Sequence, residues 1–192
     1  FVISIMWNQY IKDFSKYNTF YLEKEIIDFI SNHPLKKKIE IISDGKEILG
    51  TGGGILNLIS SCDDNDFLVF NPDTLWNESY VDEINDMQNL YFKNQLTNIL
   101  MVTNKQLSFD QNLKVVFELK KNLLKKENNK NFIYIGCQIL KKDLFKNYKV
   151  KSFSISKIWN ELLKKNELNG FESLIKFYHL TNLEIFKKLK DF

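Results

Sequence analysis

The stretch Leu49-Gly50-Thr51-Gly52-Gly53-Gly54-Ile55 is followed, after a polar segment, by the stretch Phe67-Leu68-Val69-Phe70-Asn71-Pro72-Asp73. The first stretch holds four of the seven glycines of this 192-residue chain. Glycine loses much backbone entropy on folding, so a cluster of glycines needs a structural or functional reason. The second stretch opens with a continuous apolar run, which is typical of a strand buried on both faces. We therefore expect a glycine-rich turn leading into a helix, and then a buried strand.

Strands and helices alternate along the rest of the chain. Apolar residues at helical spacing predict helices over about 21–31, 55–59, 79–92, 155–164 and 182–190, and apolar runs predict strands over 38–43, 67–70, 98–102 and 132–136. This alternation predicts an α/β fold with a mostly parallel sheet. The sequence shows no repeat and no linker, so we expect a single domain over residues 1–192.

Composition and charge exclude several classes of protein. Hydrophobic residues make up 44% of the chain, which is enough for a core, and the net charge of +3 lacks the concentrated basic face of a nucleic-acid-binding protein. No apolar run reaches the ~18 residues of a membrane span, and the apolar start of the chain lacks a signal-peptide pattern. We expect a cytoplasmic protein in which Cys62 and Cys137 are reduced. All 27 basic residues are lysines, so any side chain that binds phosphate must be a lysine.

Two sites could carry chemistry, and each has a purely structural alternative. Amides of the Gly50–Gly54 turn could face phosphate or a base, or the glycines could allow a tight turn and close helix packing. Asp73 directly follows a buried strand, where open α/β sheets bind ligands and where a carboxylate can hold Mg²⁺. Alternatively, Asp73 caps the next segment. The nearby Asp63, Asp64 and Asp66 are expected to form a solvated loop.

The chain has two histidines. His33 precedes a proline at the end of a predicted helix, where we expect an ordinary surface role. His179 ends an apolar stretch just before the last helix, and the residues alone favour a partly buried structural histidine. No serine, histidine and acid follow one another at a spacing that indicates nucleophilic catalysis.

The order of several motifs resembles the sugar-1-phosphate nucleotidyltransferases. Residues 47–55 resemble the family's "L-x-T-G-G-G" loop, and residues 67–76 resemble its apolar strand ending in "N-x-D". Residues 132–140 are similar to its sugar-site strand, and residues 177–182 to its closing motif. The most similar branch contains N-acetylmuramate-1-phosphate uridylyltransferase and mannose-1-phosphate guanylyltransferase. The resemblance runs from about residue 17 to the C-terminus and leaves residues 1–16 unmatched.

This resemblance implies a fold, a reaction and a set of site residues. The implied fold is a three-layer, Rossmann-like, nucleotide-binding sandwich, and the implied activity forms an NDP-sugar and pyrophosphate from a nucleoside triphosphate (UTP or GTP) and a sugar 1-phosphate. The implied cofactor is Mg²⁺. The implied roles are nucleotide binding for Gly50, Thr51, Gly52 and Gly53, catalysis and metal binding for Asp73, a second metal ligand at His179, and sugar binding for Gly136 and Asn71.

The sequence also departs from the family pattern. The family's first strand and its phosphate-binding loop have no counterpart here, "G-D-F" reads Val115-Val116-Phe117, and "V-G-T" reads Leu180-Thr181-Asn182. The resemblance therefore predicts an N-terminally truncated domain with exposed apolar surface and unpaired strand edges. A second hypothesis is a non-catalytic remnant or interaction module that pairs with a separate N-terminal piece. A glycosyltransferase is a weaker alternative, because it favours an Asp-x-Asp motif where this chain has one carboxylate, Asp73.

Overall fold

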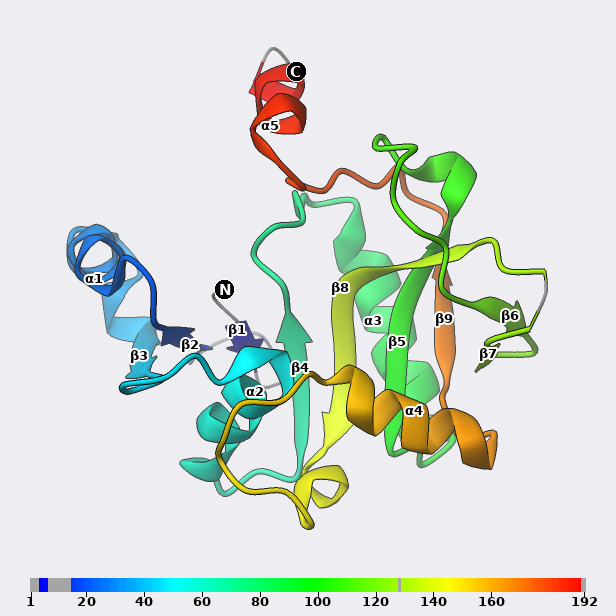
Figure 1. Ribbon diagram of the computed structural model, residues 1–192, viewed down its shortest axis with the longest axis horizontal. Coiled ribbons are helices and arrows are strands. Elements are labelled where there is room, and N and C mark those ends of the chain that lie inside the picture. Colours follow the sequence, from blue (N-terminus) through cyan, green and yellow to red (C-terminus); the bar gives the residue numbers. More distant parts are fainter. Residues whose placement is uncertain (1–3, 7–14, 128, 191–192) are drawn as a thin grey trace. The chain divides into compact units, whose positions relative to one another are not determined.

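The computed structural model describes residues 4–6, 15–127 and 129–190. Its elements, shown in Figure 1, are β1 (Ser4–Met6), β2 (Ser15–Thr19), α1 (Glu23–Ser31), β3 (Ile39–Ser43), α2 (Gly50–Ser60), β4 (Asp66–Phe70), α3 (Tyr80–Lys93), β5 (Asn98–Asn104), β6 (Glu118–Lys120), β7 (Leu123–Lys125), β8 (Phe132–Lys141), α4 (Ser156–Lys165), β9 (Gly170–Ser173) and α5 (Leu183–Lys190). This order confirms the predicted α/β class.

The chain divides into two compact units. The first unit comprises Phe1–Pro72 and Ile139–Glu161, and the second comprises Asp73–Gln138 and Leu162–Phe192. Two of the three boundaries fall inside β8 and α4, so these two elements each begin in one unit and end in the other. The single domain expected from the sequence stays a prediction.

In the first unit the strands follow the order β3-β2-β1-β4. Strand β2 is parallel to β3, whereas β1 is antiparallel to both β2 and β4. Ser4 pairs with Tyr17 on one side and with Phe70 on the other. The expectation of unpaired edges is therefore wrong for β2 and β4, because residues 4–6, which match no family motif, supply a short strand between them.

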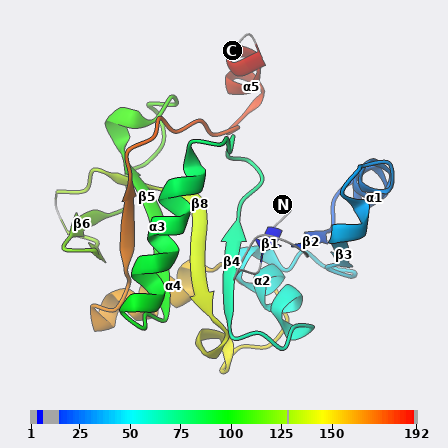
Figure 2. The same ribbon diagram turned by 180° about the vertical axis from the view of Figure 1, so that it is seen from behind.

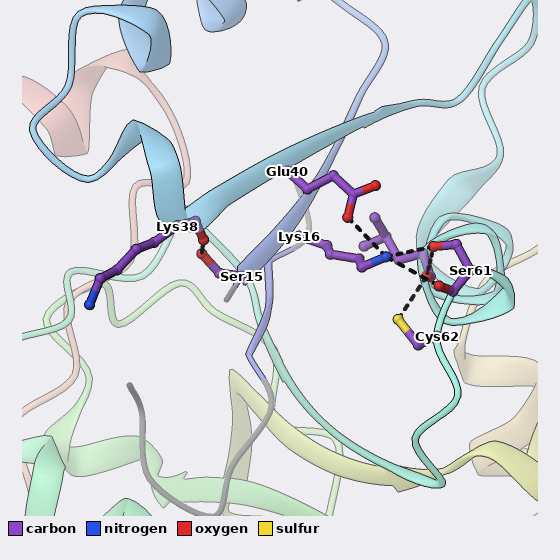
Figure 3. Close-up of polar contacts among 7 residues, drawn as sticks. Ser15, Lys16, Lys38, Glu40, Ser61 and Cys62 are labelled. Carbon is purple, nitrogen blue, oxygen red and sulfur yellow. Dashed lines mark hydrogen bonds and ion pairs between the residues drawn. The ribbon is translucent and has the colours of Figure 1, made fainter. Parts of the chain in front are cut away.

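A lysine on β2 connects this sheet to the end of α2 (Figure 3). Lys16 Nζ donates to Ser61 Oγ over 2.8 Å and forms an ion pair with Glu40 Oε2 at 3.0 Å. Burial tends to lower the pKa of Lys16, but its hydrogen bond to Glu40 and the nearby Cys62 raise this pKa overall. Lys16 therefore stays charged and holds the α2 terminus against β2. Cys62, half-buried beside it, and the buried Cys137 are both free thiols.

In the second unit the strands follow the order β8-β5-β9, and β6 and β7 form a separate antiparallel hairpin. Strands β5 and β9 are parallel, with Leu100 opposite Gly170. Helix α3 covers one face of β5, as Figure 2 shows. All residues of β5 from Asn98 to Thr103 are buried. The buried side chains of α3 recur at helical spacing: Tyr80, Ile84, Met87, Gln88 and Tyr91.

Most elements lie where the sequence predicts them, and the differences have local causes. Helix α2 begins at Gly50 rather than near Ile55, so the glycines form its first turn instead of a preceding loop. Strand β9 and the hairpin β6–β7 are three or four residues long and were not predicted, since such short segments show no clear periodicity. Within residues 4–6, 15–127 and 129–190, none of the helices is long and apolar enough to cross a membrane.

Candidate functional site

The segments that carry Asp73 and His179 are paired through their backbones. The amide of Leu180 donates to the carbonyl of Asp73 over 2.7 Å, and the amide of Leu75 donates to the carbonyl of Tyr178 over 3.0 Å. Thr74 and His179 form an antiparallel bridge between these two hydrogen bonds. This pairing brings together two residues that are more than a hundred positions apart in the sequence, and both belong to the second unit.

The carboxylate of Asp73 lacks ordinary hydrogen-bond donors. Its Oδ2 lies 3.3 Å from Nε2 of His179, and its buried Oδ1 has no hydrogen-bond partner among the residues that the structure describes. The Asp73 and His179 side chains are 30% and 23% exposed, so a small ligand from solvent can reach them. A buried carboxylate oxygen without a donor needs an explanation, and a bound cation or water is a common one.

The geometry of the pair fits a divalent cation. Two neighbouring ligands of an octahedral Mg²⁺, each at about 2.1 Å, lie about 3.0 Å apart, which is near the separation of Asp73 Oδ2 and His179 Nε2. Among the described residues, no group of three or more histidine, cysteine or acidic side chains could hold a metal ion. A single carboxylate such as Asp73 is compatible with Mg²⁺, because this ion is usually held by one or two carboxylates together with water and substrate phosphates. An imidazole is a weaker ligand for Mg²⁺ than a carboxylate, so Asp73 is the stronger of the two.

A second layer of polar groups lies behind His179. Its Nδ1 is 3.2 Å from Oγ1 of Thr181, and this hydroxyl donates to Oδ2 of Asp110 over 3.0 Å. Asp110 is 5% exposed, and its Oδ1 accepts the amide of Asn112 at 2.9 Å. Polar contacts therefore connect Asp110, Thr181, His179 and Asp73 in that order.

A hydrogen bond between the residues next to Asp73 and Gly136 connects these two positions. The buried hydroxyl of Thr74 donates to the carbonyl of Ile135 over 2.8 Å. This bond fixes the residue after Asp73 to β8 at the position next to Gly136. Gly136 is buried and has a φ of 92°, a conformation that L side chains rarely adopt. The negative charge of Asp73 also contributes to the raised pKa of Tyr134 on the same strand, after burial and Cys137.

The glycine cluster lies in the first unit, and groups of that unit already bind its amides. The amides of Gly52 and Gly53 donate to the carbonyl of Phe153 over 2.9 and 3.2 Å, and Oγ1 of Thr51 accepts the amide of Ile155 at 3.0 Å. A Cβ atom on Gly52 would lie 2.3 Å from the Phe153 ring, and one on Gly53 would lie 2.1 Å from the carbonyl oxygen of Lys151. These contacts support close packing as the reason for the glycines.

The predicted site residues thus fall into two sets. Asp73, Gly136 and His179 belong to the second unit, where the structure brings Asp73 and His179 together and joins Gly136 to them through Thr74 and Ile135. The residues Gly50, Thr51, Gly52, Gly53 and the half-buried Asn71 belong to the first unit. The nucleotide-binding role of the glycine cluster and the sugar-binding roles of Asn71 and Gly136 stay predictions.

Sequence reasoning missed Asp110 and Thr181. Asp110 follows an apolar residue in a polar stretch with no motif, and its role depends on a contact across 71 positions. Thr181 could have been noticed, because it lies two residues after His179, within reach of the same imidazole.

No protein-family model matches the sequence, and no curated protein matches it either. Solved structures do resemble the fold. HddC from Yersinia pseudotuberculosis, solved with GMP-PN, is 22% identical with a TM-score of 0.63, and the match covers 88% of this chain and 73% of HddC. A UDP-glucose pyrophosphorylase solved with UDP-glucose is 19% identical with a TM-score of 0.60, over 91% of this chain and 73% of that chain.

A third similar structure is the inositol-1-phosphate CTP transferase from T. maritima, which is 13% identical with a TM-score of 0.59 over 79% of this chain and 63% of that chain. The fold is that of the sugar-1-phosphate nucleotidyltransferases. At these identities the likeness establishes the architecture, and the resemblance read from the sequence motifs is confirmed at the level of the fold.

Proposed function

We propose that the chain is a nucleotidyltransferase-type protein that binds a nucleoside triphosphate with Mg²⁺ and a sugar 1-phosphate. In the proposed reaction an oxygen of the sugar phosphate attacks the α-phosphorus of the triphosphate. The bond from that phosphorus to the bridging oxygen breaks, so an NDP-sugar forms and pyrophosphate leaves. HddC was solved with GMP-PN and the pyrophosphorylase with UDP-glucose, which supports GTP or UTP as the first nucleotides to test.

One observation carries this proposal: among the described residues, the Asp73 carboxylate has no donor at Oδ1, and its Oδ2 faces His179. Bound Mg²⁺ would supply charge neutralisation of the phosphates. Asp73 would hold the cation, and His179 would bind it through Nε2. Phosphoryl transfer requires positioning and electrostatic stabilisation more than covalent chemistry, so a few well-placed ligands can account for much of the rate.

The pairing of residues 73–75 with 178–180 gives these ligands a fixed separation. The backbone hydrogen bonds on either side of the Thr74–His179 bridge leave little freedom to the two side chains. Gly136, with no side chain and a buried position, would leave room for the sugar beside them.

The test is thermal unfolding of the purified chain with and without Mg²⁺ plus UTP or GTP. A ligand that binds only the folded state at a hundredfold excess over Kd stabilises it by about 2.7 kcal/mol. For a chain of this size that corresponds to a rise in melting temperature of roughly 5–10 °C. We expect this rise with one of the two nucleotides, only in the presence of Mg²⁺, and we expect Asp73→Asn to abolish it.

Asp86→Asn is the matched control, because Asp86 is exposed in the middle of α3 and the substitution removes the same charge. This variant should keep the full nucleotide-dependent shift. An unchanged shift in Asp73→Asn, or no shift with any nucleoside triphosphate, would contradict the proposal. Release of pyrophosphate on adding a sugar 1-phosphate then tests whether this chain alone completes the reaction.

Helix α1 supports a second candidate function, an interaction module that pairs with a separate polypeptide. This helix has no buried side chain, and the exposed fractions of Tyr21 and Phe29 beside and within it are 73% and 70%. A groove of about 440 Å³ runs along it, lined mainly by the apolar residues Tyr17, Tyr21, Leu22, Ile26, Phe29, Ile30, Ile39 and Pro72. Apolar surface of this kind often marks a protein contact.

We propose that a separate N-terminal piece of the same fold occupies this groove, because the sequence has no counterpart to the family's first strand and phosphate-binding loop. The test is to co-express the polypeptide encoded immediately upstream and to measure complex formation by size-exclusion chromatography. Phe29→Lys should prevent a one-to-one complex. Leu183→Lys, at an exposed apolar position of α5, should leave it intact. Failure of the wild-type chain to form the complex would contradict this second candidate.

A further inference from the structure

Asp110 and Thr181 lie behind the candidate metal ligands and are assigned no role by the proposed reaction. Asp110 and Thr181 are hydrogen-bonded to each other, and the Thr181 hydroxyl also contacts Nδ1 of His179, on the side of the ring away from Asp73. Their geometry determines which imidazole nitrogen carries the proton, and this decides whether the other nitrogen can bind a cation.

The direction of each hydrogen bond follows from the groups involved. An ionised carboxylate only accepts, and a hydroxyl has a single proton to donate. Asp110 is buried, and leaving its Oδ2 without a donor would be costly, because a buried carboxylate oxygen has no water to replace the lost hydrogen bond. The Thr181 proton therefore points to Asp110, so the Thr181 oxygen presents a lone pair to His179. This arrangement requires a proton on Nδ1 of His179.

With its proton on Nδ1, a neutral His179 presents a lone pair at Nε2. That lone pair faces Oδ2 of Asp73 at 3.3 Å, and the two acceptor atoms repel each other unless a cation contacts both of them. We infer that Asp110, acting through Thr181, is a positioning residue that fixes His179 in the Nδ1–H tautomer and so makes its Nε2 a cation ligand beside Asp73. Partners of this kind behind a metal-binding histidine typically change metal affinity 10–100-fold when removed. The inference deepens the proposed function and rests on it for the identity of the cation.

The opposite arrangement is chemically possible and gives a clear alternative. If Thr181 donated to Nδ1, the ring would carry its proton on Nε2 and would donate it to Asp73. His179 would then be a structural partner of Asp73 and not a ligand.

Long-range ¹H–¹⁵N NMR of the imidazole rings distinguishes the two tautomers of a neutral histidine, and the spectra are recorded at alkaline pH. The chain has two histidines, and His33 provides an internal reference because its Nδ1 accepts the amide of Leu35 at 3.2 Å. We therefore expect His33 as the Nε2–H tautomer and His179 as the Nδ1–H tautomer. An Nε2–H tautomer at His179 overturns the inference.

Three variants separate positioning from a merely structural role. Asp110→Asn keeps an oxygen for the amide of Asn112 and turns an NH₂ group toward Thr181, so the Thr181 proton should turn to Nδ1 and His179 should switch to Nε2–H. Thr181→Val removes the hydroxyl and should also populate Nε2–H, whereas Thr181→Ser should retain Nδ1–H. Unchanged His33 signals report that the fold around that residue is preserved. A His179 tautomer that stays the same in Asp110→Asn and Thr181→Val contradicts the inference.

Binding of Mn²⁺ together with the nucleotide, followed by electron paramagnetic resonance of free Mn²⁺, gives the second readout. We expect roughly tenfold weaker binding in Asp110→Asn and Thr181→Val and wild-type binding in Thr181→Ser. Equal affinities in all four proteins would overturn the role of Asp110 in metal binding. If the wild-type chain binds no Mn²⁺, the proposed function fails, while the NMR result still decides the tautomer.

Discussion

The glycine-rich start of α2 and the Asp73–His179 pair differ in how their polar groups are used. At the start of α2, the amides of Gly52 and Gly53 and the hydroxyl of Thr51 are bound by residues 153 and 155. At Asp73, one carboxylate oxygen has no donor within the part of the chain that the structure describes, and the other faces an imidazole. In the first region the protein itself binds these polar groups, and in the second we propose that a bound cation does.

This difference makes Asp73 the stronger candidate for a ligand, although the glycine cluster is the more conspicuous pattern in the sequence. Four glycines lie within five positions, and contacts with residues 151–153 leave no space for a side chain at Gly50, Gly52 or Gly53. A single aspartate after a strand is a weak signal, but its unpaired oxygen is a specific reason to expect a cation. The glycine turn should therefore control stability, and Asp73 should control binding.

The largest expected effect is on stability in Gly53→Ala. The new Cβ would lie 2.1 Å from the carbonyl oxygen of Lys151, which belongs to the backbone and cannot move aside easily. We expect a loss of about 3 kcal/mol in the free energy of unfolding, measured by urea denaturation. A change below about 1 kcal/mol would contradict the packing explanation.

Gly52→Ala should have a smaller effect that can be relieved. Its Cβ would meet the ring of Phe153 at 2.3 Å, and a side chain can be removed by mutation. In a Phe153→Ala background we expect most of the cost of Gly52→Ala to disappear, since alanine itself favours a helix by about 1 kcal/mol over glycine. Gly53→Ala should show no such rescue. Two double-mutant cycles measure the coupling free energy of Phe153→Ala with Gly52→Ala and with Gly53→Ala. Equal coupling energies in the two cycles would contradict this prediction.

The pH dependence of stability gives an effect of moderate size in the second unit. Burial, with smaller contributions from Glu83 and Tyr178, raises the pKa of Tyr80 to about 12. An unfolded tyrosine ionises near pH 10, so the folded state retains this proton longer than the unfolded state. The stability from this shift is present below about pH 10 and is lost as the pH rises toward 12.

The free energy of unfolding should therefore fall between those two pH values. Tyr80→Phe should show a shallower fall over the same range, because it removes this group from the titration. An identical slope in the two proteins would contradict the pKa assignment.

The smallest expected effect on stability belongs to Asp73→Asn. The Asp73 carboxylate makes no hydrogen bond with a backbone amide among the described residues, so replacing its charge should change the free energy of unfolding by less than about 1 kcal/mol. Chemical denaturation without ligand measures this value. A loss as large as that of Gly53→Ala would place Asp73 among the structural residues and remove the contrast between the two regions.

The sequence predicted much of the fold because long apolar patterns determine it. Helix α3 and strands β4, β5 and β8 contain sustained apolar patterns, and each lies where it was expected. Strand β1 was not expected, because its pairing depends on long-range contacts of residues 4–6 with residues 15–17 and 68–70. The start of α2 was misplaced, because glycine opposes a helix locally and the packing against Phe153 decides otherwise.

The site could be predicted only as separate residues. Asp73 stood out by its position after a strand, and only the family resemblance implied His179 as a second metal ligand, but nothing in the sequence gave their separation of 3.3 Å. Asp110 carried no signal at all, because its role arises from a single contact with Thr181. Motif order therefore located the residues, and tertiary pairing defined their chemistry.

The most direct test of the contrast between the two regions is a titration with Mn²⁺ in the presence of the nucleotide that raises the melting temperature. Mn²⁺ shortens the relaxation of nearby nuclei, so the ring signals of His179 report whether the ion lies beside Asp73. We predict that these signals broaden beyond detection in the wild-type chain and stay sharp in Asp73→Asn, while Gly52→Ala in the Phe153→Ala background broadens as the wild type does. Sharp His179 signals in the wild-type chain, or equal broadening in Asp73→Asn, would contradict the account.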